Sequence, residues 1–270
     1  MNYFQLILLG VVQGITEWIP VSSKTQVTFV YLNFFQGDPQ FIVPVLLYVH
    51  LGTVIAAILY FRKELSGIIL EIADNPYNFR YHLNGKAGFL FVSLLCTGIV
   101  GLPLLIAERE LLSSIDTGLL YALMGGGLIV TGFLLLSQKC TNLRTRKSVS
   151  WKDGLYAGIL QGFSVLPGIS RSGTSTTGLI WRGFDSGSSF YLSFLLSIPT
   201  VILAEIILTY GVSGVGEFPV TEGMILFITS FLTGYLTLDG LLRIVQKINI
   251  AYVVLLLGIF IVTIGFSGGG

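Results

Sequence analysis

The chain has 270 residues, of which 53% are hydrophobic and only 11% are charged, and its mean hydropathy is +0.83. Soluble globular domains do not have this composition, which predicts a protein that crosses a membrane several times. A net charge of +1 says little, because the position of each charge matters here more than the sum, and we expect no nucleic-acid partner. The two cysteines show neither ligand spacing nor a pairing pattern, and we expect both to be structural.

The first apolar stretch, residues 4–19, stops at Pro20 and is too short to cross the hydrocarbon, which takes about 20 residues. A second short apolar piece follows it, and together they predict a re-entrant hairpin whose break faces protein or a water-filled cavity. Gln13 and Glu17 lie four residues apart on one helix face. A carboxylate at this depth costs about 2.5 to 3.5 kcal/mol, so Glu17 should face a cavity, a cation or a metal. The alternative is an interfacial glutamate beside Trp18.

Six later stretches qualify as membrane-spanning helices, namely residues 41–61, 87–107, 117–137, 189–210, 224–245 and 251–266. His50 lies in the middle of the first of them. At 1.5 Å per residue it would sit near the midplane, where the hairpin tips should meet, so it is a candidate acid or base. A buried histidine is more often a hydrogen-bonded core residue, and that interpretation stays open beside the first. Asp239 and Arg243 form a helix-spaced pair that we interpret as structural, whereas Glu205 has no partner that the sequence reveals.

The most polar stretch, residues 167–177, follows a second apolar piece, 154–166, that stops at Pro167. Hydroxyl side chains and glycines surround Arg171, and a new helix from about Thr174 would aim its backbone N–H groups back at the break. This pattern predicts an anion site in which Arg171 donates two hydrogen bonds to phosphate oxygens and Ser170, Ser172 and Thr174 supply neutral donors. The alternative is a polar loop with a snorkelling arginine.

The two breaks belong to an internal repeat. Five residues of the first recur 148 positions later: Gly10, Gln13, Gly14, Thr16 and Ser22 correspond to Gly158, Gln161, Gly162, Ser164 and Ser170. Each copy holds one re-entrant hairpin and three spans. Because three is odd, the copies must lie in opposite senses in the membrane, which is the inverted-repeat plan with a site between the halves.

Basic residues indicate the orientation. They cluster in the loops at 62–86, 139–152 and 182 and after the fifth span, whereas the opposite side holds mainly acidic residues. By the positive-inside rule the basic loops are cytoplasmic, which places both termini outside the cytoplasm. Of the Lys and Arg residues, only Lys24 and Arg171 lie in the hairpins, and we assign both to the site.

If the hairpins meet, Glu17, Ser22 and Ser23 come together with Ser170, Arg171 and Ser172. That assembly has an acid/base, candidate hydroxyl nucleophiles and a phosphate clamp.

The two motifs resemble those of the undecaprenyl pyrophosphate phosphatase family, whose (E/Q)xxxE and PGxSRSG patterns appear here at 13–17 and 167–173. The resemblance covers nearly the whole chain. It implies hydrolysis of a polyprenyl diphosphate to the monophosphate, recycling a lipid carrier for cell-envelope glycan assembly, with a divalent cation (Mg²⁺ or Ca²⁺) and, in bacteria, bacitracin resistance. It also implies that Glu17 is a metal or water-activating carboxylate, Ser23 a nucleophile and Arg171 the diphosphate clamp. The expected substrate-binding residues are Gln13, Ser22, Lys24, Ser170, Ser172, Gly173, Thr174 and Ser175.

Two positions depart from the family pattern. Gln26 stands where a histidine is expected and cannot transfer a proton, and Lys24 occupies a position that is usually small or hydroxylic. A catalytically silent member is therefore one alternative, and a lipid-phosphate transporter or flippase is another, because inverted repeats with midplane sites are typical of carriers.

These features predict an all-α integral membrane protein with six transmembrane helices and two re-entrant helical hairpins in an inverted-topology repeat. The chain is expected to form one membrane domain, with repeats at 1–138 and 153–266 joined by a basic cytoplasmic loop, 139–152. We expect it in the plasma membrane with a polyprenyl diphosphate lipid as its partner, and a homodimer is compatible with this plan.

Overall fold

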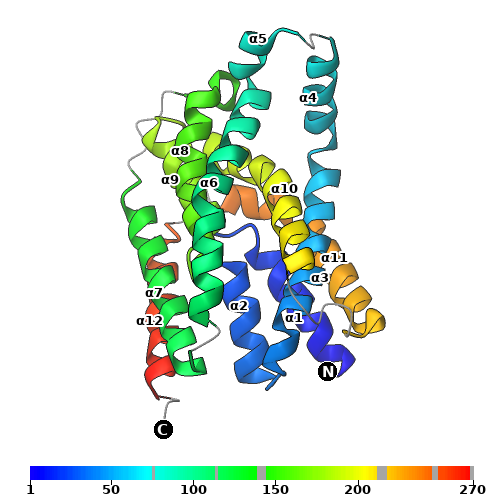
Figure 1. Ribbon diagram of the computed structural model, residues 1–270, viewed down its shortest axis with the longest axis vertical. Coiled ribbons are helices and arrows are strands. Elements are labelled where there is room, and N and C mark those ends of the chain that lie inside the picture. Colours follow the sequence, from blue (N-terminus) through cyan, green and yellow to red (C-terminus); the bar gives the residue numbers. More distant parts are fainter. Residues whose placement is uncertain (75–76, 113–114, 139–143, 212–217, 245–248, 268–270) are drawn as a thin grey trace.

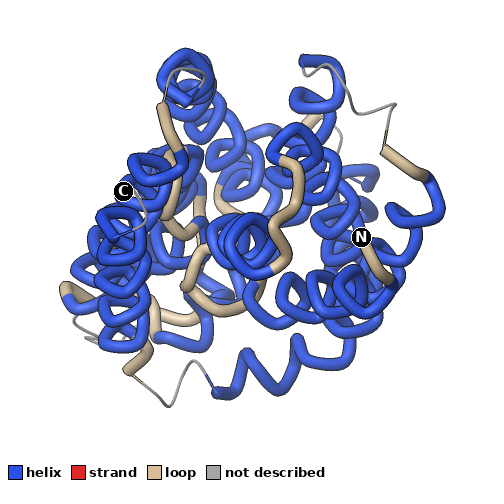
Figure 2. Tube along the Cα trace, turned by 90° about the horizontal axis from the view of Figure 1, so that it is seen from below, coloured by secondary structure: helices blue, strands red, loops and turns tan. Residues whose placement is uncertain are grey.

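The computed structural model describes residues 1–74, 77–112, 115–138, 144–211, 218–244 and 249–267. Within these residues the chain is helical, without a strand, and has one isolated β-bridge between Arg144 and Phe184. Figures 1 and 2 show the resulting bundle, in which loop segments lie inside a ring of helices. The all-helical fold is therefore confirmed.

The α-helices in chain order are α1 (Tyr3–Thr16), α2 (Ser23–Phe29), α3 (Ile42–Tyr60), α4 (Arg62–Asp74), α5 (Phe79–Leu83), α6 (Lys86–Leu112), α7 (Thr117–Leu136), α8 (Trp151–Gly162), α9 (Arg171–Trp181), α10 (Ser186–Gly211), α11 (Val220–Ile244) and α12 (Ala251–Ser267). A π-helix, Val30–Phe34, continues α2, and three short 3₁₀ helices occupy Pro39–Phe41, Arg146–Ser148 and Phe163–Val165.

Polar side chains cap several helix starts, as the free N–H groups of a first turn require. The Asn2 side chain accepts a hydrogen bond from the N–H of Gln5 at 2.9 Å, and the Asp116 carboxylate accepts one from Leu119 at 2.8 Å. Ser170 caps α9 in the same way through the N–H of Gly173.

Five described segments are long and apolar enough to cross a membrane: Pro39–Tyr60, Lys86–Glu108, Thr117–Leu136, Ser186–Ile207 and Val220–Ile244. They coincide with five of the six expected spans, so the chain is a multi-pass membrane protein. The sixth expected span, 251–266, forms α12, which has only 17 residues. At 14 residues α1 is shorter still, and it ends before Pro20, as the hairpin prediction required.

The segment between the first two spans is more ordered than the sequence suggested. We expected a basic loop at 62–86, and the structure instead forms α4 and α5 there, at the top of Figure 1. The Glu64 carboxylate on α4 accepts hydrogen bonds from Lys86 and from the Tyr191 hydroxyl. Burial alone would raise the pKa of Glu64, but these donors outweigh it and hold the pKa below its ordinary value. Of the expected basic linker 139–152, residues 139–143 lie outside the described residues.

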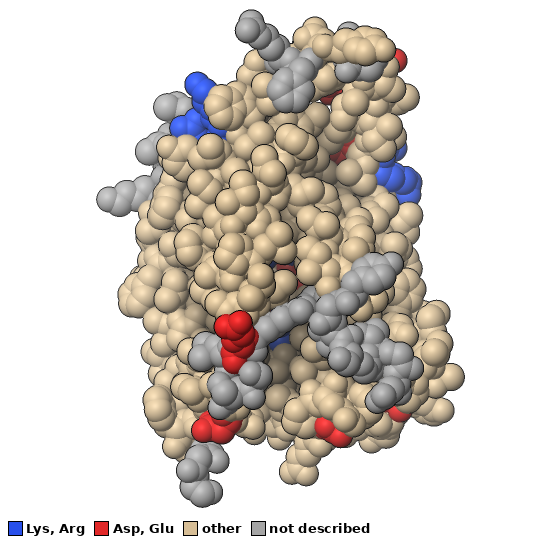
Figure 3. Space-filling view, in the orientation of Figure 1, with Lys and Arg blue, Asp and Glu red and all other residues tan. Residues whose placement is uncertain are grey.

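Both chain ends lie at the end of the bundle opposite α4 and α5 (Figure 1). On the face shown in Figure 3, the blue Lys and Arg atoms at the surface lie toward the α5 end, and most of the red Asp and Glu atoms lie toward the other end. This separation of charge along the long axis follows the loop pattern read from the sequence.

Close helix contacts hold the two halves of the chain together. The helix α7 packs on α12 and crosses it at glycines: a Cβ added to Gly125 would lie 2.5 Å from the Gly258 carbonyl oxygen. The helix α1 packs on α11, and α8 packs on α6. The first helix of each hairpin thus lies against a long helix of the other half, which brings the two breaks into the centre of the bundle.

Candidate active site

The first break places a carboxylate beside a hydroxyl. The helix α1 ends at Thr16, and the amide of Gln13 donates to Glu17 Oε2 at 2.9 Å, across the predicted i,i+4 spacing. Ser22 then takes a left-handed conformation (φ 56°, ψ 85°), which is uncommon for a residue with a side chain and turns the chain so that α2 can begin at Ser23. The Ser23 hydroxyl donates to Glu17 Oε2 at 2.6 Å.

The second break delivers a guanidinium to the same carboxylate. Gly168 has φ 83°, and a Cβ there would lie 1.9 Å from the Met124 carbonyl oxygen, so only glycine fits this turn. Ser170 is fixed by donation of its N–H to Thr131 Oγ1 at 3.0 Å. Arg171, the first residue of α9, reaches across to Glu17 and donates from Nη2 to Oε1 at 2.6 Å. The two breaks in the chain therefore meet, as predicted.

The other guanidinium nitrogen of Arg171, Nη1, is buried and has no hydrogen-bond partner within the described structure. A buried charged donor without an acceptor costs free energy, because the water it has lost is not replaced. Arg171 is thus held by Glu17 through one nitrogen while a second donor is left for an incoming acceptor, such as a phosphate oxygen.

Beside these residues lies a cavity of about 700 Å³. Its polar lining includes Glu17, Ser22, Ser23, Lys24, His50, Glu108, Ser170, Arg171, Ser172 and Glu205. Most of the remaining wall is aliphatic, contributed by α3, α6 and α10 and including Leu46, Leu94, Leu102, Leu105, Leu203 and Ile207. Figure 3 shows a hollow near the middle of one face, with acidic and basic atoms visible inside it. A site with charged groups at one end and a long apolar wall suits an amphipathic ligand with an anionic head group.

Some predicted substrate contacts do not reach this cavity. The cavity lining does not include Gly173, Thr174 or Ser175. We expected a helix from about Thr174, but α9 begins at Arg171, so the hydroxyls of Thr174 and Ser175 bond back to the Arg171 carbonyl at 3.0 and 2.8 Å. Gln13 also lies behind the cavity wall, where it holds Glu17.

The two residues that depart from the family pattern, Gln26 and Lys24, lie in different places relative to the cavity. The Gln26 amide donates to the Val21 carbonyl at 3.0 Å and so braces the hairpin turn, outside the cavity lining. Lys24 does line the cavity, and its Nζ lies 2.9 Å from Glu108 Oε1. Glu108 is buried, and sequence reasoning had counted it only among the acidic residues of the outer loops.

His50 lies on the cavity wall between two carboxylates. Its Nε2 is 3.7 Å from Glu17 Oε2, and its Nδ1 is 3.4 Å from Glu205 Oε1 on α10. Nδ1 is also 2.8 Å from the Leu46 carbonyl oxygen. This position supports the interpretation of His50 as a site residue over that of a core histidine. Glu205 was recognised in the sequence only as an unpartnered acid, since nothing local links residues 50 and 205.

The described residues contain no group of three or more His, Cys, Asp or Glu side chains that could hold a metal ion. Glu17, the predicted ligand, has both carboxylate oxygens engaged by Arg171, Gln13 and Ser23. Because Glu17 Oε2 accepts the hydrogen bond of the Ser23 hydroxyl, the geometry suits a base that takes a proton from a hydroxyl.

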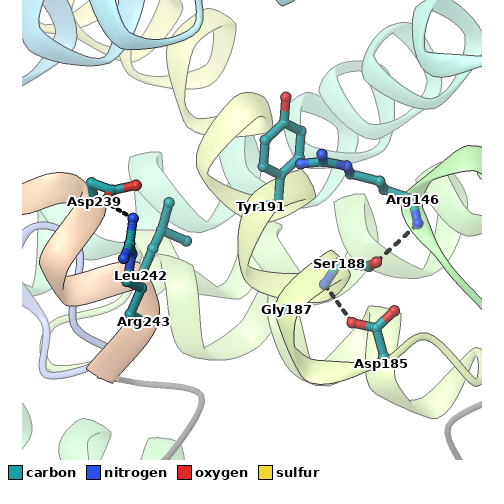
Figure 4. A pocket seen from close by; sticks show the side chains of 8 residues that line it. All are labelled: Arg146, Asp185, Gly187, Ser188, Tyr191, Asp239, Leu242 and Arg243. Carbon is teal, nitrogen blue, oxygen red and sulfur yellow. Dashed lines mark hydrogen bonds and ion pairs between the residues drawn. The ribbon is translucent and has the colours of Figure 1, made fainter.

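A second, smaller hollow of about 310 Å³ lies between the ends of α10 and α11 (Figure 4). Its charged groups already have partners: Arg243 pairs with Asp239 at 2.8 Å, and the Arg146 guanidinium lies 3.9 Å from the centre of the Tyr191 ring. The predicted structural pair of Asp239 and Arg243 is thereby confirmed. With its basic groups engaged, this hollow is a weaker candidate for an anion site than the larger cavity.

The sequence was compared with protein families and with curated proteins. The family model described as "Bacitracin resistance protein BacA" matches residues 6–263. The chain is 36% identical over 261 residues to an undecaprenyl-diphosphatase of Methanococcoides burtonii, covering 96% of this chain and 97% of that protein. It is 34% identical over 242 residues to one of Haloarcula marismortui (90% and 89% covered) and 35% identical over 253 residues to one of Methanopyrus kandleri (93% and 92% covered).

Proposed function

The chain belongs to the bacitracin resistance protein BacA family, and on that premise we propose that it hydrolyses a polyprenyl diphosphate, such as undecaprenyl diphosphate, to the monophosphate and inorganic phosphate. The reaction returns a lipid carrier to the form used for cell-envelope glycan assembly. The chain is thus a membrane-bound hydrolase of a phosphoanhydride. The observation that carries the proposal is the meeting of Ser23, Glu17 and Arg171 in the polar part of a cavity whose remaining wall is mostly aliphatic.

In the first step Glu17 accepts the Ser23 proton across the 2.6 Å hydrogen bond, while Ser23 Oγ attacks the terminal phosphorus. The new Oγ–P bond replaces the phosphoanhydride bond, and the polyprenyl monophosphate leaves. Arg171 turns its free Nη1 donor onto the transferring phosphoryl oxygens, whose charge it neutralises. Water then attacks the phosphoserine, phosphate leaves, and Ser23 recovers its proton from Glu17.

Other cavity residues position the substrate. Lys24, Ser170 and Ser172 line the charged end and supply further donors to the two phosphates, and the aliphatic wall takes the first isoprenoid units. A divalent cation would reach the site with the substrate phosphates, because such cations bind phosphates readily and Glu17 is already engaged by Arg171, Gln13 and Ser23. Its chemistry there is to neutralise phosphate charge.

The proposed membrane arrangement has six spans and two re-entrant hairpins in an inverted repeat, with both termini on the outer side of the plasma membrane. Three observations support it: the chain ends share one end of the bundle, basic side chains favour the other, and α1–α11 contacts are mirrored by α8–α6 contacts. We therefore propose a single membrane domain. The homodimer stays a prediction.

Phosphate release by the purified protein in detergent tests the function. We expect release from polyprenyl diphosphates longer than farnesyl diphosphate that is faster with Mg²⁺ or Ca²⁺ than without. Ser23→Ala should lower it roughly 10³-fold or more, as expected for a lost nucleophile. Ser66→Ala is the matched control, because the Ser66 hydroxyl is exposed on α4 and bonds only its own helix. A carrier would bind the lipid and leave its diphosphate intact, and that result would refute the proposal.

A further inference from the structure

A second carboxylate faces the cavity and has no part in the steps above. Glu205 on α10 is 6% exposed and lines the cavity beside His50. Its Oε1 lies 3.4 Å from His50 Nδ1, while its Oε2 is buried and has no hydrogen-bond partner among the described atoms. Burying a carboxylate in this way is costly unless a proton or a cation compensates it.

The surroundings of His50 indicate where that proton resides. Two acceptors, the Leu46 carbonyl oxygen at 2.8 Å and Glu205 Oε1 at 3.4 Å, face Nδ1, so Nδ1 carries a hydrogen. On the other side of the ring, Nε2 is 3.7 Å from Glu17 Oε2. A lone pair on Nε2 would point at a carboxylate oxygen, whereas an N–H there is attracted to it. The imidazolium form therefore suits both sides of the ring.

The charge balance of the cavity leads to the same form. Its ionisable groups, among the described side chains, are Glu17 after α1, Lys24 on α2, Glu108 on α6, Arg171 on α9 and Glu205 on α10, whereas α11, which also packs on α3, contributes none. Among these described groups three carboxylates against two cations leave one negative charge, and one proton on the His50–Glu205 pair brings the sum to zero. Buried charge is tolerated when it is paired in this way.

We propose that Glu205 is a positioning residue that keeps His50 protonated, with Nε2–H aimed into the cavity, so that His50 gives its proton to the departing polyprenyl phosphate. This inference rests on the proposed function and adds the proton donor that its first step lacks. As the phosphoanhydride bond breaks, the leaving oxygen takes the Nε2 proton while Glu17 holds the Ser23 proton. When water attacks the phosphoserine, its proton returns to His50 and Ser23 recovers its own from Glu17, so protons balance over the cycle.

Nuclear magnetic resonance of the histidines tests the proposal without reference to turnover. The chain has only two, so ¹⁵N-histidine labelling gives two ring systems, and His82→Gln assigns them. We expect the His50 ring to be an imidazolium at neutral pH in the wild type and neutral in Glu205→Gln. A neutral ring in the wild type, or an unchanged imidazolium in Glu205→Gln, would overturn the proposal.

Kinetics give the second test. Glu205→Gln should lower kcat roughly tenfold with little change in KM, less than the 10²- to 10⁴-fold loss expected for removing a general acid in His50→Gln. Because the variant needs more acid to protonate His50, its kcat should recover toward the wild-type value at acidic pH, whereas that of His50→Gln should not. The double variant should be no slower than His50→Gln.

Asp239→Asn serves as the control, since Asp239 is exposed and distant in the fold from this cavity. Additive losses in the double variant, or a pH profile of Glu205→Gln parallel to that of the wild type, would refute the positioning role. If Glu205→Gln does not fold, Glu205→Met, which also removes the carboxylate at similar volume, carries the same two readouts, the protonation state of the His50 ring and the pH profile of kcat. A wild-type protein that releases no phosphate would refute the proposed function instead, and the state of the His50 ring would still decide the pairing.

Discussion

Replacing Arg171 by lysine keeps the positive charge but removes the two guanidinium nitrogens that can bind two acceptors at once. This substitution is therefore the sharpest test of the proposed phosphate clamp. Arg171 engages Glu17 through Nη2 at 2.6 Å and keeps Nη1 free, so one side chain can bridge the base and the phosphate. A lysine ammonium is a single point of charge and satisfies one of these two acceptors in this geometry. The loss is then about one charge-assisted hydrogen bond in the transition state, worth about 1.5 to 3 kcal/mol.

At about 1.36 kcal/mol for each factor of ten, kcat/KM should fall roughly 10- to 150-fold in Arg171→Lys. The assay is phosphate release from a polyprenyl diphosphate across a range of substrate concentrations. Arg243→Lys is the matched control, because Arg243 is 75% exposed and its pair with Asp239 should contribute little. Activity of Arg171→Lys within twofold of the wild type would show that the bridge seen in the structure does not form during catalysis.

Two further predictions concern stability and topology. Asp153 is fully buried and accepts hydrogen bonds from Arg144, Arg182 and Ser150. Burial would raise the pKa of Asp153, but these donors hold it below the ordinary value of 3.8. The carboxylate therefore contributes its full share to the free energy of unfolding above about pH 4, and this share is lost as the pH falls further. Asp153→Asn should therefore cost about 1 to 3 kcal/mol at neutral pH, seen as a lower Tm in detergent, and the difference from wild type should shrink in acid. For topology, impermeant thiol reagents should label Lys147→Cys only from the cytoplasm and Pro219→Cys only from outside; labelling from the same side would exclude the inverted repeat.

The sequence predicted well what depends on length and local pattern. Helix α3 (Ile42–Tyr60) and helix α7 (Thr117–Leu136) each end within a residue or so of the expected spans, because an apolar run of fixed length has one way to cross a bilayer. Pro20 and Pro167 marked the two breaks, since neither can continue a helix without losing a hydrogen bond. The meeting of Glu17 with Arg171 followed from the cost of burying either charge alone.

What the sequence could not supply depends on helix phase and on contacts between distant segments. A helix that begins at Arg171 in place of Thr174 turns Thr174 and Ser175 inward to the Arg171 carbonyl, so a count of hydroxyls overestimated the ligand contacts. Glu205 reaches His50 only because α10 packs on α3. Local composition indicates neither the start of α9 nor the contact between Glu205 and His50. The helix α4 was missed for another reason, because its mixed charges resemble those of a loop.

The repeat that we propose would account for the meeting of two unlike chemical groups at one carboxylate. Ser23 and Arg171 are 148 positions apart, the same offset as the repeat, and each is the first residue of the helix that follows its break. The same offset pairs Glu17 with Val165, which lines the cavity but has no charge. Phosphoryl transfer needs a nucleophile on one side of the phosphorus and charge neutralisation around it. The two helix starts that follow the breaks provide both positions, with Ser23 supplying the hydroxyl and Arg171 the guanidinium.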